Sequence, residues 1–411
     1  MNSIVIIGGG HAAAQLCASL AEAGLGARVH LVCAEGHLPY QRPPLSKAYL
    51  KNPAEVLQPH RGDAWYAQAG ITVHRSDPAV AINRAAKTVR LQSGTALAYG
   101  HLVLATGARA RRPAGWPATL ANVAVLRDAV DAEQCRALLA GAASLTVLGG
   151  GFIGLEVAGT ARALGLAVQV VELAPRLLGR SVSAELAEQV LASHRATGIA
   201  VDLNATLGAI EHDHSRLLAL TVNDQRQAVE RLLLGIGAEP EVGLALAADL
   251  LVDNGIVVDA AMRSSDPSIL AIGDVARFPV SPRWAPAGTT LRLESVQNAN
   301  DQARIAALTI QGQAPTYAAL PWFWSEQGQL RLQMAGLMTA PDTPGASRHR
   351  RRGANEASFS ILHYVADRLV CVESVNAPMD HVMSRKLLEA DRHPAPAQAC
   401  DPAVALKSLL A

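Results

Sequence analysis

The sequence predicts an α/β protein with two parallel-sheet βαβ units and a C-terminal α+β domain. Residues 3–10 (SIVIIGGG) and 145–151 (LTVLGGG) are apolar, β-branched runs that lead directly into glycines. Each is followed by an Ala- and Leu-rich segment of helical length and then by a second apolar run, which is the order of a βαβ unit. From about residue 320, alternating apolar segments replace this pattern and favour an antiparallel sheet.

The first βαβ unit is expected to be followed by short meander strands and a further buried strand. Residues 12–23 are expected to form its helix and residues 28–32 its second strand. Residues 72–83 and 88–91 have the pattern of short meander strands, and residues 102–106 (LVLAT) that of a buried strand ending at a glycine. The remaining expected elements are helices at 154–164 and 296–311, buried strands at 167–171, 231–237, 255–258 and 269–274, and antiparallel strands at 331–334, 358–365 and 369–375.

Composition indicates a folded protein without a strongly charged target. Half of the 411 residues are hydrophobic and 17% are charged, and the length allows two or three domains. Lys plus Arg number 36 and Asp plus Glu 35, so the formal charge of +1 does not favour nucleic acid or an anionic membrane as a partner. Aromatic residues make up only 4%, which also disfavours a platform for stacked bases.

The five cysteines are Cys17, Cys33, Cys135, Cys371 and Cys400. They form no C-x-x-C pair and no metal-ligand spacing, so we expect reduced thiols, no metal site and no redox-active cysteine pair. The first residues lack the pattern of a cleavable signal, and no run reaches the roughly 18 apolar residues of a membrane helix. The expected location is the cytoplasm.

Both glycine turns match the G-x-G-x-x-G/A fingerprint. The matching residues are Gly8, Gly10 and Ala13 in the first turn and Gly149, Gly151 and Gly154 in the second. The first position allows a tight turn, the second lets backbone N–H groups approach a pyrophosphate, and the third packs helix on strand. One such match is weak evidence, but both copies stand between a strand and a helix. They therefore predict two dinucleotide sites rather than two ordinary βα turns.

An acidic residue at the end of the second strand of each unit is expected to hold a ribose. In the second unit this residue is Glu172, at about the 20-residue spacing of the fingerprint. A carboxylate there accepts from the 2′- and 3′-hydroxyls and repels a 2′-phosphate, which favours NADH over NADPH. Arg176 and Arg180 lie close by and argue against this preference unless they are solvated charges. In the first unit the candidate is Glu35, with a surface-loop carboxylate as the alternative.

Residues 38–47 (LPYQRPPLSK) are the most specific segment of the chain. Two prolines restrict the backbone between Arg42 and Lys47. The segment resembles that of the FAD-dependent ferredoxin reductases of bacterial oxygenase systems, of the putidaredoxin reductase and aromatic-dioxygenase reductase type. The resemblance extends over essentially the whole chain, through GGGHAA, LATGARAR, VLGGGFIGLEVA, VVELAPRLLGR, GIGAEP, ILAIGDVA, LESVQNA and PWFWSEQ.

The resemblance implies the glutathione reductase fold. In that fold a Rossmann-like FAD domain is split by an inserted Rossmann-like NAD domain, and a C-terminal α+β interface domain follows. On this pattern we expect the FAD-binding domain at residues 1–112 and 242–318, the NAD-binding domain at 113–241 and the interface domain at 319–411.

The resemblance also implies which residues bind the cofactors, FAD and NADH. Besides the fingerprints and the two acids, they are Arg42, Lys47, Val80, Ala105, Gly107, Arg127, Arg180, Gly237, Asp274 and Val296. Arg42 and Arg127 are suited to a pyrophosphate, although a surface arginine pair is the alternative. Asp274 ends a buried strand in AIGD and resembles the aspartate that accepts from the ribityl chain.

The activity implied is hydride transfer from NADH to FAD, followed by release of single electrons. The catalytic candidates are Lys47 and Glu156, expected as an ion pair beside the flavin, and Trp324 of PWFW, expected near the flavin and nicotinamide rings. The alternatives are a helix carboxylate with a structural partner for Glu156 and a core tryptophan for Trp324.

The partner implied is a small acidic [2Fe–2S] ferredoxin that binds transiently and serves a cytochrome monooxygenase or a Rieske dioxygenase. Candidates for its basic docking face are Arg304, Arg385 and Lys386, whereas residues 348–352 (RHRRR) are either a docking surface or a solvated loop. The competing functions are an NADH reductase of rubredoxin or a small quinone, and an apoptosis-inducing-factor-like flavoprotein, which shares RPPLSK.

Three positions depart from the family pattern. Ala34 stands where an acidic residue usually holds the adenosine ribose, so Glu35 must serve there or the contact is missing. Gln41 and Glu326 each replace a frequent aspartate. None of the three is expected to take part in hydride transfer directly.

Overall fold

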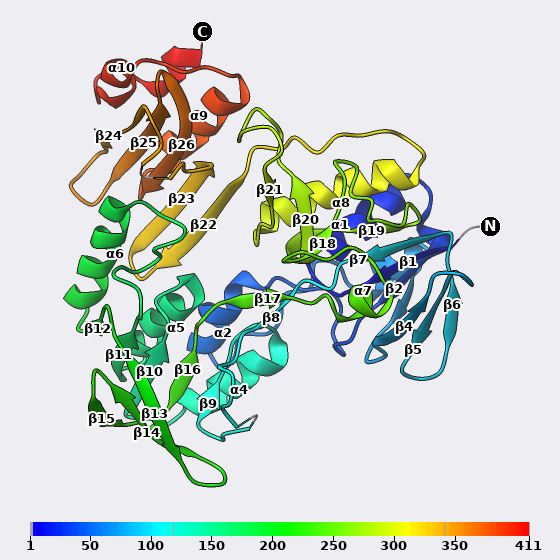
Figure 1. The fold of residues 1–411 in the computed structure, drawn as a ribbon, viewed down its shortest axis with the longest axis horizontal. Helices are drawn as coiled ribbons and strands as arrows, with labels where there is room; N and C mark the ends of the chain where they lie inside the picture. The colour runs from blue at the N-terminus through cyan, green and yellow to red at the C-terminus, as the bar shows by residue number, and fades with distance from the viewer. Residues whose placement is uncertain (1–2, 118, 341, 411) are drawn as a thin grey trace. The chain divides into compact units, whose positions relative to one another are not determined.

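The computed structural model describes residues 3–117, 119–340 and 342–410. The chain divides into two compact units, and its elements are labelled in Figure 1. The first unit comprises Met1–Gln41, Leu57–Arg109 and Glu239–Phe323, and the second comprises Arg42–Val56, Ala110–Ala238 and Trp324–Ala411.

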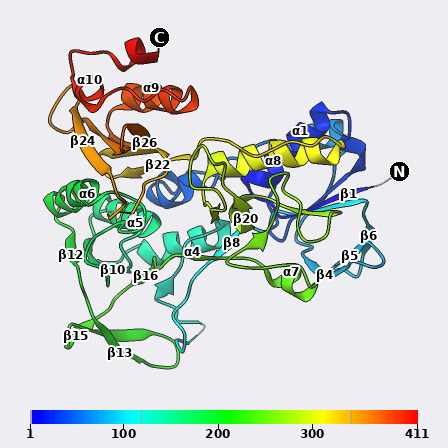
Figure 2. The ribbon, with the colours of Figure 1, turned by 45° about the horizontal axis from the view of Figure 1, so that its top comes forward.

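The first unit is built on a parallel five-stranded sheet of order β19-β7-β1-β2-β3. Its strands are β1 (Ile4–Ile7), β2 (Val29–Val32), β3 (Thr72–His74), β7 (His101–Leu104) and β19 (Ile269–Ala271). All four residues of β1 are buried, as expected for a central strand covered on both faces. Helices α1 (His11–Glu22) and α8 (Val296–Ile310) pack side by side in this unit, as Figure 2 shows.

Smaller elements complete the first unit. They are β4 (Ala79–Asn83), β5 (Thr88–Leu91), β6 (Ala96–Ala98), β18 (Ile256–Val257), β20 (Ala276–Pro279), β21 (Thr290–Leu291), α3 (Asp63–Gln68), α7 (Gly243–Ala247), η1 (Gly26–Arg28) and η3 (Gly273–Val275). The meander predicted for residues 72–83 is wrong at its start. The strand β3 pairs in parallel with β2, with Thr72 opposite His30, while β4 pairs antiparallel with β5.

The second unit contains another parallel sheet, of order β12-β11-β10-β16-β9. Its strands are β9 (Val123–Ala124), β10 (Ser144–Leu148), β11 (Ala167–Val171), β12 (Ala200–Asp202) and β16 (Leu232–Leu234), and its helices are α4 (Ala129–Leu139), α5 (Phe152–Ala163) and α6 (Ala184–Ala196). Side-chain caps begin two of these helices: Asp128 accepts from the backbone N–H of Asp131, and Ser183 from that of Leu186.

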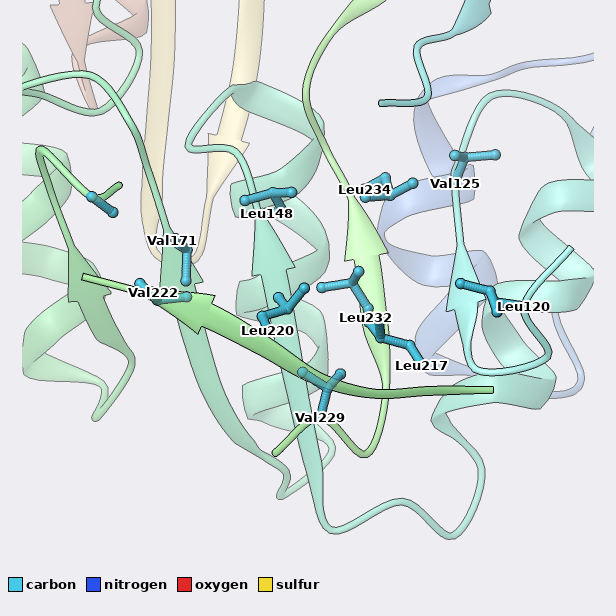
Figure 3. Packing of buried hydrophobic residues seen from close by; sticks show 11 residues of the cluster. Leu120, Val125, Leu148, Val171, Leu217, Leu220, Val222, Val229, Leu232 and Leu234 are labelled. Atoms are coloured by element: carbon cyan, nitrogen blue, oxygen red, sulfur yellow. The ribbon is translucent and has the colours of Figure 1, made fainter. Parts of the chain in front are cut away.

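A three-stranded antiparallel sheet packs on the second parallel sheet through leucine and valine side chains. Its strands are β13 (Leu207–His212), β14 (Leu217–Val222) and β15 (Gln225–Ala228). Figure 3 shows Leu220 and Val222 of β14 directed toward Val171 and Leu232 of the parallel sheet. All four side chains are at most 1% exposed. This core holds in place the strands whose ends form the second glycine turn.

The C-terminal sheet has the order β22-β23-β26-β25-β24, and β26 pairs antiparallel with β23 and β25, as β25 does with β24. The remaining elements are β22 (Trp322–Gln327), β23 (Leu330–Gly336), β24 (Ala346–Arg352), β25 (Phe359–Val365), β26 (Arg368–Val375), α9 (Pro378–Glu389), α10 (Pro396–Cys400), η4 (Leu406–Leu410), η2 (Pro43–Ser46), α2 (Ala48–Lys51), and the paired strands β8 (Ala108–Ala110) and β17 (Ala238–Pro240). Residues 348–352 lie in strand β24, so the solvated-loop interpretation is wrong. Arg351 is buried there because its guanidinium donates to the carbonyl oxygens of Ala399 and Val404.

Within the described residues, no helix combines the length and the apolar character needed to cross a bilayer. The same part of the chain holds no group of three or more side chains that could bind a metal ion. All five cysteines lie among the described residues as free thiols; Cys400 is half-buried and the other four are buried.

Candidate functional site

The first glycine turn has the geometry that a pyrophosphate requires. Gly8 follows β1 with φ +129°, and a Cβ at this position would overlap the carbonyl oxygen of Ala105 at the end of β7. A Cβ on Gly10 would meet nothing within 4 Å, so the approach to the first turn of α1 is open there. Ala13 is fully buried against the sheet. The turn is therefore tight on its inner side and accessible on its outer side, which fits a dinucleotide phosphate.

Two further FAD candidates lie beside this turn. Gly273, with φ +77°, sits so close to α1 that a Cβ would lie 3.2 Å from the Cβ of Ala12. Asp274 follows it in η3, and Val296 is the first residue of α8. The backbone N–H of Gly273 donates to Gln302 of α8 at 2.7 Å. Gly273, the neighbour of Asp274, thus lies between α1 and α8, close to the helix that follows the first fingerprint.

The remaining candidates of the first unit lie on its loops and short strands. Glu35 follows β2, and its carboxylate accepts from the hydroxyl of Tyr40 at 2.6 Å. Val80 lies on β4 and is 46% exposed. Gly107, with φ +70°, follows β7, and its carbonyl accepts from the backbone N–H of Glu241 at 2.9 Å. The roles of these residues in cofactor binding stay predictions.

The positions that depart from the family pattern have different surroundings. Ala34 and Glu326 are exposed. Gln41 instead joins two histidines: its amide oxygen lies 3.2 Å from Nε2 of His11, and its amide nitrogen lies 3.1 Å from Nδ1 of His60. Because His11 is the first residue of α1, Gln41 anchors the start of the helix that follows the first fingerprint.

The second glycine turn repeats the geometry of the first, and its helix also packs closely at the third position. Gly149 has φ +106°, and a Cβ there would lie 2.5 Å from the carbonyl oxygen of Gly235. A Cβ on Gly154 would lie 2.5 Å from the carbonyl oxygen of Gly149. At Gly151, in contrast, the nearest atom would be 3.8 Å away. This turn also closes against the sheet and stays open above the start of α5, as a dinucleotide requires.

Glu172 directly follows β11 and is held against the second turn. One carboxylate oxygen accepts from the backbone N–H of Gly150 at 2.6 Å, and the other from that of Ala174 at 2.7 Å. Arg176 donates to the carbonyl oxygens of Val182 and Gly179, so its guanidinium is engaged by backbone. Arg180 is exposed near Gly237, where a Cβ would lie 3.7 Å from its guanidinium.

Arg42 and Arg127 lie together in the second unit. The guanidinium of Arg42 donates to the carbonyl oxygen of Arg127 at 2.9 Å. The backbone N–H of Arg127 in turn donates to Asp131 in the first turn of α4. Burial, together with the nearby Asp128 carboxylate, raises the pKa of Asp131 to about 6.

The predicted ion pair of Lys47 and Glu156 is present. Glu156 is 6% exposed on α5, and its carboxylate accepts from the Lys47 ammonium at 2.7 Å and from the Ser46 hydroxyl at 2.5 Å. The carbonyl of Ser46 accepts from Thr160, one turn along the same helix, at 2.8 Å. The segment that contains the two prolines is thereby fastened to α5, and the lysine is held both by Glu156 of this helix and by the carbonyl of Pro43 in its own segment.

The neighbouring polar residues were not identified from the sequence. The hydroxyl of Ser325 on β22 donates to the Glu156 carboxylate at 2.6 Å. The side-chain amide of Gln327 donates to Ser325 at 2.8 Å, and its oxygen lies 3.2 Å from Nε2 of His194. Ser325 and Gln327 belong to the PWFWSEQ segment, so the resemblance includes them, but the sequence does not indicate that they contact Glu156 and His194. Trp324, the predicted aromatic, is half-buried on the same strand.

The basic residues considered for docking are distributed over both units. Arg304 lies on α8 and pairs with Asp301 at 2.6 Å. Arg385 lies on α9, where Glu389 is 3.6 Å away, and Lys386 is exposed beside it. On β24, Arg350 pairs with Glu185 at 2.8 Å. Their role in docking stays a prediction.

Comparison with known proteins gives one consistent result. Residues 2–303 match the family described as pyridine nucleotide-disulphide oxidoreductase, and residues 322–410 match the reductase C-terminal family. The chain is 41% identical to rhodocoxin reductase of Rhodococcus erythropolis, with 100% of this chain and 94% of the relative covered. It is 36% identical to putidaredoxin reductase of Pseudomonas putida, with 100% and 97% covered.

Solved structures agree with these relatives. A ferredoxin reductase for the CYP199A2 system from Rhodopseudomonas palustris superposes with a TM-score of 0.93 at 40% identity, and each chain is covered completely. A covalent complex of putidaredoxin reductase with putidaredoxin gives a TM-score of 0.91 at 34% identity, covering 100% of this chain and 98% of the other.

These findings confirm the predicted fold class, the predicted enzyme class and the resemblance to ferredoxin reductases. They support the cofactor prediction at the level of a flavin and a nicotinamide nucleotide. The chain belongs to the pyridine nucleotide-disulphide oxidoreductase family.

Proposed function

We propose that this chain is an NADH-dependent ferredoxin reductase, which takes a hydride from NADH onto FAD and delivers single electrons to a [2Fe–2S] ferredoxin of a cytochrome monooxygenase or Rieske dioxygenase system. The observation that carries the proposal is the pair of open glycine turns, one in each unit, of which the second has a carboxylate held at its edge. Within this proposal the FAD-binding domain comprises residues 1–112 and 242–318, the NAD-binding domain 113–241 and the interface domain 319–411.

FAD is assigned to the first turn. The open face at Gly10 lets the first N–H groups of α1 bind the pyrophosphate. Gly273 lies against Ala12 of α1 and Ala299 of α8. Its neighbour Asp274 and the start of α8 are proposed to bind the ribityl chain. When bound, FAD supplies the ability to accept a hydride and return electrons one at a time. Lys47, Glu156 and Trp324 are proposed to contact the flavin ring.

NADH is assigned to the second turn. Glu172 offers the lone pairs of its carboxylate to a ribose 2′-hydroxyl, and its charge opposes a 2′-phosphate. The engagement of Arg176 by the carbonyls of Val182 and Gly179 supports the same preference, because that guanidinium already has acceptors. Arg180 and Gly237 are proposed to border the bound nucleotide.

A ferredoxin is proposed as the electron acceptor because the chain has five separate free thiols and no disulfide that could accept the electrons. Relatives named for their acceptors support this choice: terpredoxin reductase of Pseudomonas sp is 37% identical over 100% of this chain. A rubredoxin is the second candidate, since a rubredoxin-NAD(+) reductase of Pseudomonas putida is 38% identical over 92% of this chain.

Steady-state electron transfer with purified protein tests the proposal. The bound flavin is released and identified by chromatography, and NADH is compared with NADPH using ferricyanide as a general acceptor. Ferredoxins and rubredoxins from the same genome are then offered one at a time. We expect FAD, a preference for NADH and fast reduction of one ferredoxin. A protein that reduces ferricyanide with NADH but reduces none of the ferredoxins would refute the ferredoxin assignment.

A further inference from the structure

A chain of hydrogen bonds runs from Glu156 into the interior of the second unit. The carboxylate accepts from the Ser325 hydroxyl at 2.6 Å, and Ser325 accepts from the side-chain amide nitrogen of Gln327 at 2.8 Å. The side-chain oxygen of Gln327 lies 3.2 Å from Nε2 of His194. Glu156, Ser325, Gln327 and His194 are at most 6% exposed. A polar chain buried to this extent is stable only when each member has its partner.

Every hydrogen in this chain has a determined direction. The Gln327 amide nitrogen also donates to the carbonyl oxygen of Phe152 at 3.2 Å, and a carbonyl can only accept, so the amide oxygen must face His194. His194 therefore carries its proton on Nε2. Burial lowers the pKa of His194, which keeps the imidazole neutral near pH 7. Because the Ser325 oxygen already accepts from the Gln327 amide, the hydroxyl hydrogen of Ser325 points to Glu156.

The three hydrogen bonds thus run in one direction, from His194 to Gln327, from Gln327 to Ser325 and from Ser325 to the Glu156 carboxylate. The residues come from distant parts of the sequence. His194 lies on α6, Ser325 and Gln327 lie on β22, and Glu156 lies on α5. Side chains alternate along β22, so that Ser325 and Gln327 face α5 while Glu326 between them is exposed. Donors aligned in this way polarise one another and favour one orientation of the acceptor.

We propose that Ser325, Gln327 and His194 are positioning residues that set the orientation of Glu156 and, through it, of the Lys47 ammonium. The Lys47 ammonium donates to the carboxylate of Glu156 at 2.7 Å and to the carbonyl of Pro43 at 3.2 Å, so turning the carboxylate moves the lysine. This inference rests on the proposed function in one respect: Lys47 is taken to face the flavin. The C-terminal sheet then contributes directly to the reaction by holding the ion pair.

Removal of the serine hydroxyl is the first test. In Ser325→Ala, Glu156 loses a charge-assisted hydrogen bond, and we expect reduction of the flavin by NADH to slow about tenfold. The flavin midpoint potential should become more negative, by about 30 mV if the equilibrium also changes tenfold. Ser325→Thr keeps the hydroxyl and should restore both quantities.

A matched control separates positioning from general loss of packing. Ser374 is also a fully buried serine of the C-terminal sheet, and its hydroxyl hydrogen-bonds to Ser360 at 2.9 Å rather than to Glu156, Gln327 or His194. Ser374→Ala should lower the melting temperature while leaving the potential and the rate of flavin reduction unchanged. If Ser325→Ala changes only the melting temperature, as Ser374→Ala does, the positioning role is wrong.

A second measurement does not depend on bound flavin or on activity. In protein labelled with ¹⁵N-histidine, His194 should show a protonated Nε2 and an unprotonated Nδ1 at pH 7. Gln327→Leu should shift the Nε2 resonance, and Ser325→Ala should shift it less. A His194 protonated on Nδ1 would overturn the hydrogen-bond chain itself. If His194 shows the expected protonated Nε2 but the protein reduces no ferredoxin, the proposed function is wrong and the series of hydrogen bonds from His194 to Glu156 is still supported.

Discussion

The two glycine turns follow the same backbone course but differ in how closely each helix approaches its strand. In the second turn a methyl group on Gly154 would lie 2.5 Å from the carbonyl oxygen of Gly149. In the first turn the equivalent position is Ala13, whose methyl group is accommodated in a fully buried site. The third position of the fingerprint therefore depends on how closely each helix packs on its strand. Only the first position, Gly8 or Gly149, is required by the turn itself, because a Cβ there would overlap a backbone carbonyl.

The acids beside the two turns are also held differently. Glu172 accepts from two backbone N–H groups, at 2.6 Å and 2.7 Å, so the turn itself fixes its position. Glu35 stands three residues after β2, and its carboxylate accepts from the Tyr40 hydroxyl. The backbone at and after the second turn therefore fixes the Glu172 carboxylate, whereas the Glu35 carboxylate is held by a side chain of its own loop. We therefore expect the second turn to select a ribose more strictly than the first.

The largest effect is expected from closing each turn with a methyl group. Gly8→Ala and Gly149→Ala both place a Cβ at positive φ against a backbone carbonyl, at a cost of about 3 kcal/mol or more. Gly8→Ala should yield protein without flavin. Gly149→Ala should keep its flavin absorbance, lose reduction by NADH and still be reduced by dithionite.

Two other glycines isolate the effect of the overlap. Gly94 and Gly165 have φ +92° and +95°, and a Cβ on either would meet nothing within 4 Å. Alanine at these positions should therefore cost only about 1 kcal/mol of backbone strain and leave both cofactors bound. If Gly149→Ala also loses its flavin, the assignment of FAD to the first turn is contradicted.

The third position of the fingerprint gives the next largest effect. Helix propensity alone predicts that Gly154→Ala stabilises the protein by about 1 kcal/mol. The overlap with the Gly149 carbonyl predicts the opposite, a loss of about 2–3 kcal/mol, because the contact is with backbone that cannot turn aside. Ala13→Gly should cost about 1 kcal/mol. Chemical unfolding measures both, and a more stable Gly154→Ala protein would show that α5 is free to move off its strand.

A buried histidine of the second unit is expected to make the stability of the protein sensitive to acid. His381 on α9 of the second unit is 1% exposed, and burial, followed by the charges of Arg385 and Arg331, lowers its pKa to about 4. The folded protein then binds this proton less tightly than the unfolded chain, whose histidine has a pKa of about 6.5. Stability is therefore present at neutral pH and is lost as pH falls from about 6.5 toward 4, by about 2 kcal/mol at pH 5.

Thermal melting as a function of pH tests this expectation. His381→Gln removes the titrating group and should flatten the decline of the melting temperature between pH 7 and pH 5. His214→Gln, an exposed histidine of the same unit, serves as the control and should leave the decline unchanged. Equal slopes for the two variants would mean that another group governs the loss of stability in acid.

Much of the fold was predictable because it depends on local patterns. The strand predicted at 167–171 is β11 (Ala167–Val171), and the helix predicted at 154–164 is α5 (Phe152–Ala163). The strand β24 was missed because its arginines resemble a solvated run. Only the structure shows that Arg351 points inward, where the carbonyl oxygens of Ala399 and Val404 accept from it.

The site was predictable only where a motif identified its residues. Lys47 and Glu156 were paired through the family resemblance, and the structure brings them to 2.7 Å. The contact between Ser325 and Glu156 spans 169 positions of sequence and leaves no periodic signal in either segment. Such long-range polar contacts arise when α5 packs on β22. Local patterns in a single sequence do not indicate which helix packs on which strand.

The smallest expected effect tests the difference between the two acids most directly. Glu172→Ala removes the carboxylate proposed to accept from the ribose, and kcat/KM for NADH should fall about tenfold while that for NADPH stays level or rises. Glu172→Gln keeps an acceptor for one backbone N–H but lacks the charge, so it should relax the preference with less loss of stability. Glu35→Ala should alter FAD affinity and leave the nicotinamide preference untouched, because that acid is proposed to act at the other turn. An unchanged NADH preference in both Glu172 variants would mean that Glu172 only braces its turn, and that the contrast between the two acids is one of structure rather than of specificity.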